Sequence, residues 1–210
     1  MNDFFDIIIH TDEKLLELVN QYGTNTYLIL FTIIFCETGL VFFPFLPGDA
    51  LLFAAGILAA TGALNVYMLA AILIVAAILG NTINYFIGRY ASQYFLRIKN
   101  RIFQKYLREA TFFYNKHGGK AIVISRFFPI VRTYVPFVAG VTKMNAKSYT
   151  LYNVLGGIFW VFLFVFGGYF LGNIPWAKDN FSLLMLILLT LTTIPFIYSS
   201  LKSIRKKMAA

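Results

Sequence analysis

Residues 25–62 read NTYLILFTIIFCETGLVFFPFLPGDALLFAAGILAATG, and this stretch decides the fold. It is too long and too apolar for a single membrane crossing of about 20 residues. Proline and glycine interrupt it, above all at Pro47 and Gly48, and such pairs end helices. We therefore expect a crossing over residues 25–42, followed by a re-entrant hairpin over residues 43–62 that turns near Pro47 and Gly48.

The composition of the whole chain places this stretch in an integral membrane protein. Of the 210 residues, 59% are hydrophobic and 13% are charged, whereas soluble domains have about 45–50% and about 25%. Residues 18–88 contain only two charges, Glu37 and Asp49. The length allows one polytopic membrane domain over residues 1–210 and excludes a large extramembrane domain. No basic and aromatic module for nucleic acid is visible.

The distribution of the 18 basic residues predicts the topology. Residues 89–120 carry eight Lys or Arg against one acid, Glu109, and the C-terminal tail is basic as well, so the positive-inside rule places both on the cytoplasmic side. Residues 66–88 then cross inward, and residues 121–142, interrupted by Pro129 and Pro136, form a second hairpin that enters from the cytoplasm. Crossings over residues 148–172 and 181–201 follow, with both termini cytoplasmic.

An internal repeat supports this plan. Residues 53–57 (FAAGI) recur 84 positions later as residues 137–141 (FVAGV), and residues 85–88 (YFIG) recur at the same offset as residues 169–172 (YFLG). The repeats would span residues 25–88 and 121–172 with opposite orientations in the membrane, as in many secondary transporters. The alternative is chance, because both patterns are common in membrane helices.

Residues 93–117 are predicted to form an amphipathic helix at the membrane interface, between the two halves. Their basic residues fall on one helical stripe with aromatic and aliphatic residues elsewhere, a pattern that binds the surface of anionic membranes. Gly118 and Gly119 can end this helix. We therefore expect anionic lipid as a partner of residues 93–117.

Four charges lie at membrane depth, where an unpaired charge is costly. They are Glu37, Asp49, Arg126 and Arg132. Their structural interpretation is a salt-bridge clasp between the two hairpins. Their functional interpretation assigns Arg126 and Arg132 to a phosphate, because guanidinium forks match phosphate oxygens, and Glu37 and Asp49 to proton coupling.

Further motifs accompany these four charges, at residues 37–39 (ETG), 45–49 (FLPGD), 55–56 (AG), 80–81 (GN), 85–89 (YFIGR), 116–118 (KHG), 125–133 (SRFFPIVRT), 139–140 (AG) and 168–172 (GYFLG), with Pro136, Met144, Asn153 and Trp160. With these motifs the sequence resembles the DedA family, the bacterial branch of the VTT-domain superfamily. The resemblance implies an inner-membrane protein with two re-entrant hairpins that returns undecaprenyl phosphate across the cytoplasmic membrane. It also implies that an embedded Glu, an acid after Pro-Gly and two Arg six positions apart are required, which fall on Glu37, Asp49, Arg126 and Arg132. The chain departs from many relatives at Asn81, where they have Asp, so a third embedded carboxylate is absent.

Two functions are compatible with these residues. The first is a proton-coupled flippase for a polyprenyl phosphate, and the alternative is a proton-coupled exporter of cationic drugs that serves membrane-potential and pH homeostasis, with the arginines as counter-ions. We expect no enzyme, because neither His10 nor His117 lies in a phosphatase context. We expect no cofactor and no metal site, and we leave a homo-oligomer possible. For Asn81, Asn84, Asn153 and Trp160 we favour hydrogen bonding and packing between helices over substrate contact.

Overall fold

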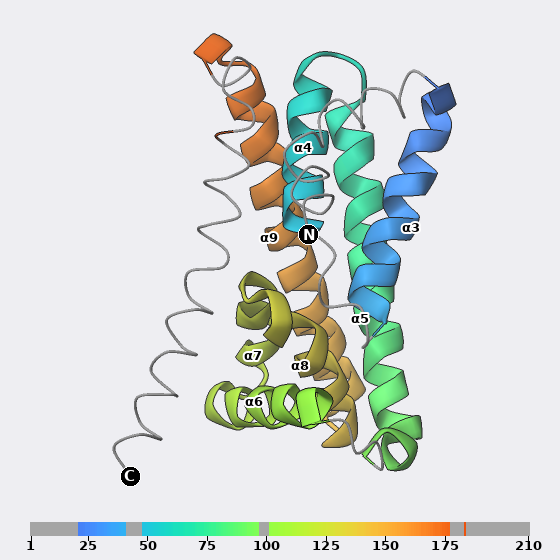
Figure 1. Cartoon of the computed structure of the whole chain (residues 1–210), viewed down its shortest axis with the longest axis vertical. Coiled ribbons are helices and arrows are strands. Elements are labelled where there is room, and N and C mark those ends of the chain that lie inside the picture. Colours follow the sequence, from blue (N-terminus) through green and yellow to red (C-terminus); the bar gives the residue numbers. More distant parts are fainter. Residues whose placement is uncertain (1–20, 41–47, 97–100, 177–182, 184–210) are drawn as a thin grey trace.

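The computed structural model describes residues 21–40, 48–96, 101–176 and 183, and within them the fold is entirely helical (Figure 1). An all-α architecture is therefore confirmed for the part of the chain that the structure describes. The predicted crossing over residues 181–201, the basic tail and Pro47 lie outside these residues, apart from Leu183. The elements are η1 (Gly23–Asn25), α3 (Thr26–Gly39), α4 (Gly48–Ala60), α5 (Val66–Leu96), α6 (Arg101–His117), α7 (Lys120–Ile124), η2 (Ser125–Phe127), α8 (Pro129–Val141) and α9 (Ala146–Gly172).

In the described part of the chain, two helices, α5 and α9, are long and apolar enough to cross a membrane, over Val66–Ala91 and Ala146–Gly172. Each begins at an asparagine whose side chain accepts hydrogen bonds from backbone N–H groups of the first turn, Asn65 for α5 and Asn145 for α9, as expected of a helix N-cap. The two helices run antiparallel along the longest axis of the molecule (Figure 1). Helix α5 extends to Leu96, eight residues beyond the predicted end at Gly88.

The first half of the chain contains two short helices, α3 and α4. Helix α3 has 14 residues and ends at Gly39, where Leu40 turns to extended backbone; at 1.5 Å per residue it is about 21 Å long, short of the about 30 Å hydrocarbon core. Helix α3 occupies most of the predicted crossing over residues 25–42, whose last two residues lie outside the described chain, so the crossing stays a prediction. Helix α3 descends to mid-height, and α4 rises from mid-height to the level at which α3 began (Figure 1). The predicted hairpin over residues 43–62 includes residues 43–47, which the structure does not describe, and also stays a prediction.

The second half also contains two short helical limbs that meet at mid-height. Helices α7 and η2 form one limb and α8 forms the other, with the break at Phe128, which is extended. Pro129 is the first residue of α8, a position where its fixed φ angle suits the helix and its missing N–H leaves no hydrogen bond unmade. Pro136 lies inside α8, so the expectation that it marks a turn is wrong.

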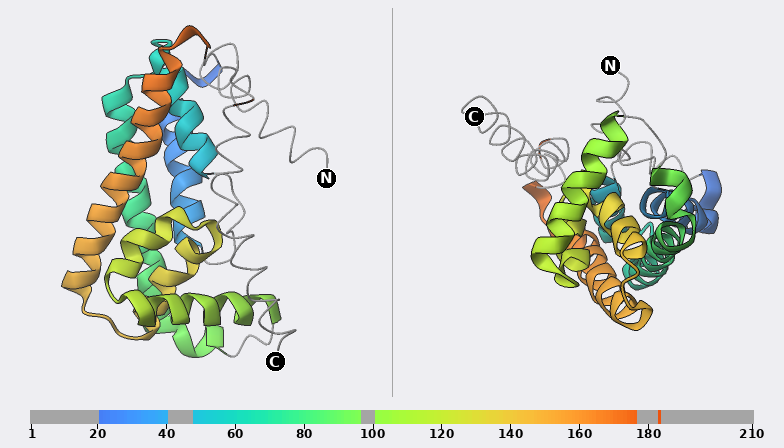
Figure 2. Two further views of the ribbon diagram at one scale, coloured as in Figure 1. Left: turned by 90° about the vertical axis from the view of Figure 1, so that its left-hand side faces the viewer. Right: turned by 90° about the horizontal axis from the view of Figure 1, so that it is seen from below.

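Helix α6 lies crosswise beneath the long helices, at the lower end of the molecule (Figure 2). Its buried side chains, Leu107 and Ala110, contact the lower core, and Lys105 and Arg108 are exposed. The helix ends at His117, before Gly118 with a φ of +57°, as the sequence predicted. Its start at Arg101 corrects the predicted start, because residues 93–96 still belong to α5.

Glycines let helices approach closely at several places, and two of these pair a short helix with a long one. Helix α4 packs against α9, where a Cβ at Gly56 would overlap the carbonyl oxygen of Val165 and one at Gly168 would overlap that of Phe53. Helix α8 packs against α5, where a Cβ at Gly140 would overlap the carbonyl oxygen of Tyr85. Such close backbone approach is what small residues permit between membrane helices. The two pairs hold the ends of the short helices at mid-height.

Candidate functional site

The site is built at mid-height, where the short helices end. Glu37 lies in the last turn of α3 and is only 1% exposed. The backbone N–H of Gly48, the first residue of α4, donates a hydrogen bond to its Oε1 at 3.2 Å. A Cβ at position 48 would overlap the carboxyl group of Glu37, so any larger residue here would move that carboxyl group. The glycine that the sequence marks as a turn thereby also positions Glu37.

Arg132, in the first turn of α8, joins the two halves of the chain. Its Nη2 donates to Glu37 Oε1 and its Nη1 donates to Asp49 Oδ1 at 2.6 Å. Each arm of its planar guanidinium holds a different carboxylate through its own nitrogen, whereas lysine would present a single nitrogen to both. Arg132 thus links α8 to both α3 and α4.

Asp49 has a second donor. It lies in the first turn of α4, where the helix dipole favours a negative charge. The indole Nε1 of Trp160, on α9, donates to the same Oδ1 at 2.9 Å. Asp49 is therefore fixed by two side chains from two other helices, Arg132 and Trp160.

Arg126 has different surroundings from Arg132. It lies in η2, is 3% exposed, and its Nη2 donates to Asn153 Oδ1 at 2.7 Å and to the Asn153 carbonyl oxygen at 3.3 Å. With the amide of Asn81 oriented to satisfy its neighbours, the Asn81 oxygen accepts from the same Nη2 at 3.0 Å and its nitrogen donates to the carbonyl oxygen of Thr38. Among the described residues no carboxylate pairs with Arg126. A buried guanidinium held by neutral amides is a site that favours an anion.

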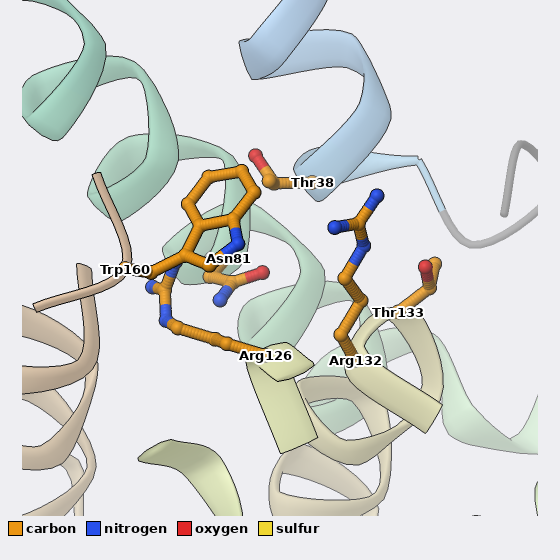
Figure 3. A pocket seen from close by; sticks show the side chains of 6 residues that line it. All are labelled: Thr38, Asn81, Arg126, Arg132, Thr133 and Trp160. Carbon is orange, nitrogen blue, oxygen red and sulfur yellow. The ribbon is translucent and has the colours of Figure 1, made fainter. Parts of the chain in front are cut away.

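A small pocket lies between the two arginines. Its room is that of about one water molecule, and both guanidiniums lie near the Trp160 ring, at 5.9 Å for Arg126 and 5.4 Å for Arg132. Figure 3 shows the two side chains reaching the pocket from neighbouring elements of the second half. The lining residues are Thr38, Asn81, Arg126, Arg132, Thr133 and Trp160.

Two charged groups of the site contain buried atoms without a hydrogen-bond partner. Within the described part of the chain, Glu37 Oε2 and Arg126 Nε are sealed from solvent and unpartnered. A third such atom, Asn84 Oδ1, lies nearby, on a side chain whose nitrogen donates to the carbonyl oxygens of Thr38 and Thr133. Unpartnered buried polar atoms are rare in folded proteins and call for a functional explanation.

The structure brings three of the four predicted charges into direct contact, Glu37, Asp49 and Arg132. It places the fourth, Arg126, beside them without a carboxylate. The sequence predicted hydrogen bonding between helices for Asn153, which accepts from Arg126, and packing for Trp160, which also donates to the charged group of Asp49. The sequence does contain a signal for these contacts, because an amide and an indole N–H in apolar helices must each find a hydrogen-bond partner at membrane depth.

Comparison with known proteins matches most of the chain to one family. Residues 46–170 match the VTT domain. The chain is 47% identical over 209 residues to "Protein DedA" of Escherichia coli (strain K12), covering 98% of this chain and 94% of that protein. It is 36% identical over 157 residues to "Inner membrane protein YqjA" of the same strain, covering 71% of this chain and 69% of that protein.

A mycobacterial relative extends the comparison. The chain is 36% identical over 193 residues to an uncharacterized membrane protein of Mycobacterium tuberculosis (strain ATCC 25618 / H37Rv), covering 90% of this chain and 85% of that protein. No solved structure matches the chain. The names of these relatives and the two long apolar helices are consistent with an inner-membrane protein. The chain belongs to the DedA family of VTT-domain membrane proteins.

Proposed function

We propose that this protein is a transporter that moves an anionic lipid phosphate, of the polyprenyl phosphate class to which undecaprenyl phosphate belongs, across the cytoplasmic membrane. The observation that carries the proposal is Arg126, a buried guanidinium without a carboxylate partner in the described chain, beside the pocket. Arg132 lies on the same pocket. Two guanidiniums around one small space match the oxygens of a phosphate head group, while a polyprenyl tail could stay in lipid.

Proton coupling forms part of this proposal. Carrying a negative charge inward against an inside-negative potential costs about 2.3 kcal/mol per 100 mV. Protons that move with the phosphate cancel this cost, and Glu37 and Asp49 are the carboxyl groups of the site that could bind them. The pocket is too small for a phosphate as it stands, so the head group enters only when the carboxylates release Arg132 or the helices separate.

The two glycine-paired helix packings support alternating access as the transport mode. Gly56 and Gly140 stand 84 positions apart, the offset of the sequence repeat. Gly56 lies where α4 meets α9, and Gly140 lies where α8 meets α5. Helices α4 and α9 run upward together, whereas α8 and α5 run downward (Figure 1). We propose that the two halves are inverted repeats, in which the short helix of each half packs on the long helix of the other.

The exporter of cationic drugs has less support from the contacts. A cation would need free carboxylates, and both Glu37 and Asp49 bind Arg132. Such a compound would have to displace a guanidinium that two carboxylates hold. The contacts favour an anion as the substrate.

The other predicted partner is anionic lipid at α6. The exposed side chains of Lys105 and Arg108 provide the positive charge, and Phe112, 72% exposed, provides an apolar contact. We propose that this helix lies on the cytoplasmic surface of the membrane.

Competition during reconstituted transport tests the substrate class. Farnesyl phosphate, a soluble polyprenyl phosphate, should inhibit uptake of undecaprenyl phosphate by the purified protein, and the cation tetraphenylphosphonium should not. Inhibition by the cation alone would show that the protein is instead an exporter of cationic drugs. Arg126→Ala should abolish uptake of undecaprenyl phosphate.

A further inference from the structure

We infer that Glu37 takes up the proton that accompanies the phosphate, whereas Asp49 remains ionised throughout the transport cycle. This division of roles rests on the proposed function. The sequence alone gives Glu37 and Asp49 the same role, but the contacts around their carboxyl oxygens differ.

The two carboxyl groups have different partners. Asp49 Oδ1 accepts from both Arg132 Nη1 and Trp160 Nε1. Glu37 Oε1 accepts from Arg132 Nη2 and from the Gly48 N–H, but Glu37 Oε2 is buried and has no partner in the described chain. A sealed oxygen without a donor destabilises the ionised form. A proton on Oε2 removes this charge, and Asp49 has no oxygen among the sealed, unpartnered atoms.

The charges of the site predict that proton and anion bind together. The charged groups that face Glu37 are Arg132 from α8 and Asp49 from α4, so these three groups carry one net negative charge. Arg126 carries one positive charge, which makes the empty site neutral. A monoanionic phosphate adds one negative charge and a proton on Glu37 adds one positive charge. The loaded site is then neutral as well, and neither state buries a net charge.

Protonation of Glu37 also frees a donor for the phosphate. The only bond that forms is the O–H bond between the incoming proton and Glu37 Oε2, and the same bond breaks on release. Once Glu37 is neutral, Arg132 Nη2 loses its charged acceptor and turns toward the pocket it already lines (Figure 3). Arg132 Nη1 stays with Asp49, which Trp160 holds in place. The phosphate is then bound by Arg126 and by the released arm of Arg132.

Infrared difference spectroscopy tests this division on the unmodified protein. The purified chain is mixed with farnesyl phosphate, and the carbonyl stretching band of a protonated carboxyl group is recorded. The measurement is repeated on protein grown with side-chain ¹³C-labelled glutamate and on protein grown with side-chain ¹³C-labelled aspartate. Binding of farnesyl phosphate is measured separately by calorimetry.

The expected result is a protonated-carboxyl band that appears on binding, shifts with labelled glutamate and does not shift with labelled aspartate. Glu37→Gln should bind farnesyl phosphate without this band. The matched control, Glu109→Gln, replaces an exposed glutamate of α6 that pairs with Lys105 and should retain the band. A band that shifts with labelled aspartate, or binding without any band, overturns the inference and leaves the proposed function standing. Absence of binding overturns both.

Discussion

Arg126 and Arg132 are both buried, and what they contact separates their roles. Arg132 holds two carboxylates from two other helices, so it contributes to the fold and to the site together. Arg126 contacts amides and the face of Trp160. Its charge is therefore available to an incoming anion, whereas that of Arg132 becomes available only when a carboxylate releases it.

Arg132→Ala should destabilise the protein more than Arg126→Ala. Removing Arg132 leaves two buried carboxylates without a counter-ion, and breaking a buried pair in this way costs about 3–5 kcal/mol. Removing Arg126 leaves neutral amides unpaired, at about 1–3 kcal/mol. Unfolding of both purified variants in detergent measures the difference. Equal stability of the two would contradict the different roles assigned to them.

Trp160→Phe should weaken transport while leaving an aromatic ring at this position. The substitution removes the indole N–H, which donates to Asp49, together with part of the ring system, and a hydrogen bond to a charged group contributes about 1.5–3 kcal/mol. Trp176→Phe is the control, because Trp176 is exposed and lies at the far end of α9 from the site. Reconstituted uptake compares the two variants, and equal uptake would exclude Trp160 from the site.

At the scale of the elements, the absence of a side chain at Gly156 on α9 leaves room for Arg126 to reach the pocket. A Cβ at Gly156 would lie 3.1 Å from Arg126 Nε and 3.2 Å from the backbone of Val123. Gly156→Ala should therefore shift Arg126 and lower the affinity for farnesyl phosphate. Gly167→Ala, on the same helix, meets only the Phe53 ring at 3.9 Å and should bind as the wild type does. Equal affinity of the two variants would show that Arg126 does not need this room.

The packing of α4 on α9 and of α8 on α5 predicts similar effects for two glycine substitutions. Gly56→Ala would force α4 away from α9, and Gly140→Ala would force α8 away from α5, because each Cβ would overlap a backbone carbonyl oxygen. Each should lower stability by about 1–3 kcal/mol through overpacking. Thermal unfolding in detergent, with Gly167→Ala as the tolerant control, measures both. A large loss in one variant beside none in the other would argue against equivalent halves.

At the scale of the whole molecule, the sequence predicted the helical class, the two long helices and the meeting of acids with arginine. It did not locate the end of α3, because apolar residues continue past Gly39 and nothing in their pattern marks the change to extended backbone at Leu40. It misread Pro136, which α8 accommodates internally. The unequal surroundings of Arg126 and Arg132 could not be foreseen, since they depend on which side chains α3, α4 and α9 bring to each arginine.

Uptake of undecaprenyl phosphate by proteoliposomes that contain the purified chain tests the central claim most directly. It is measured with and without an inward proton gradient, for the wild type, Glu37→Gln, Arg132→Ala and the control Glu109→Gln. The account predicts uptake that the gradient stimulates in the wild type and the control. It predicts no gradient-driven uptake in the other two variants. Absence of uptake by the folded wild type, or undiminished uptake by folded Arg132→Ala, would contradict it.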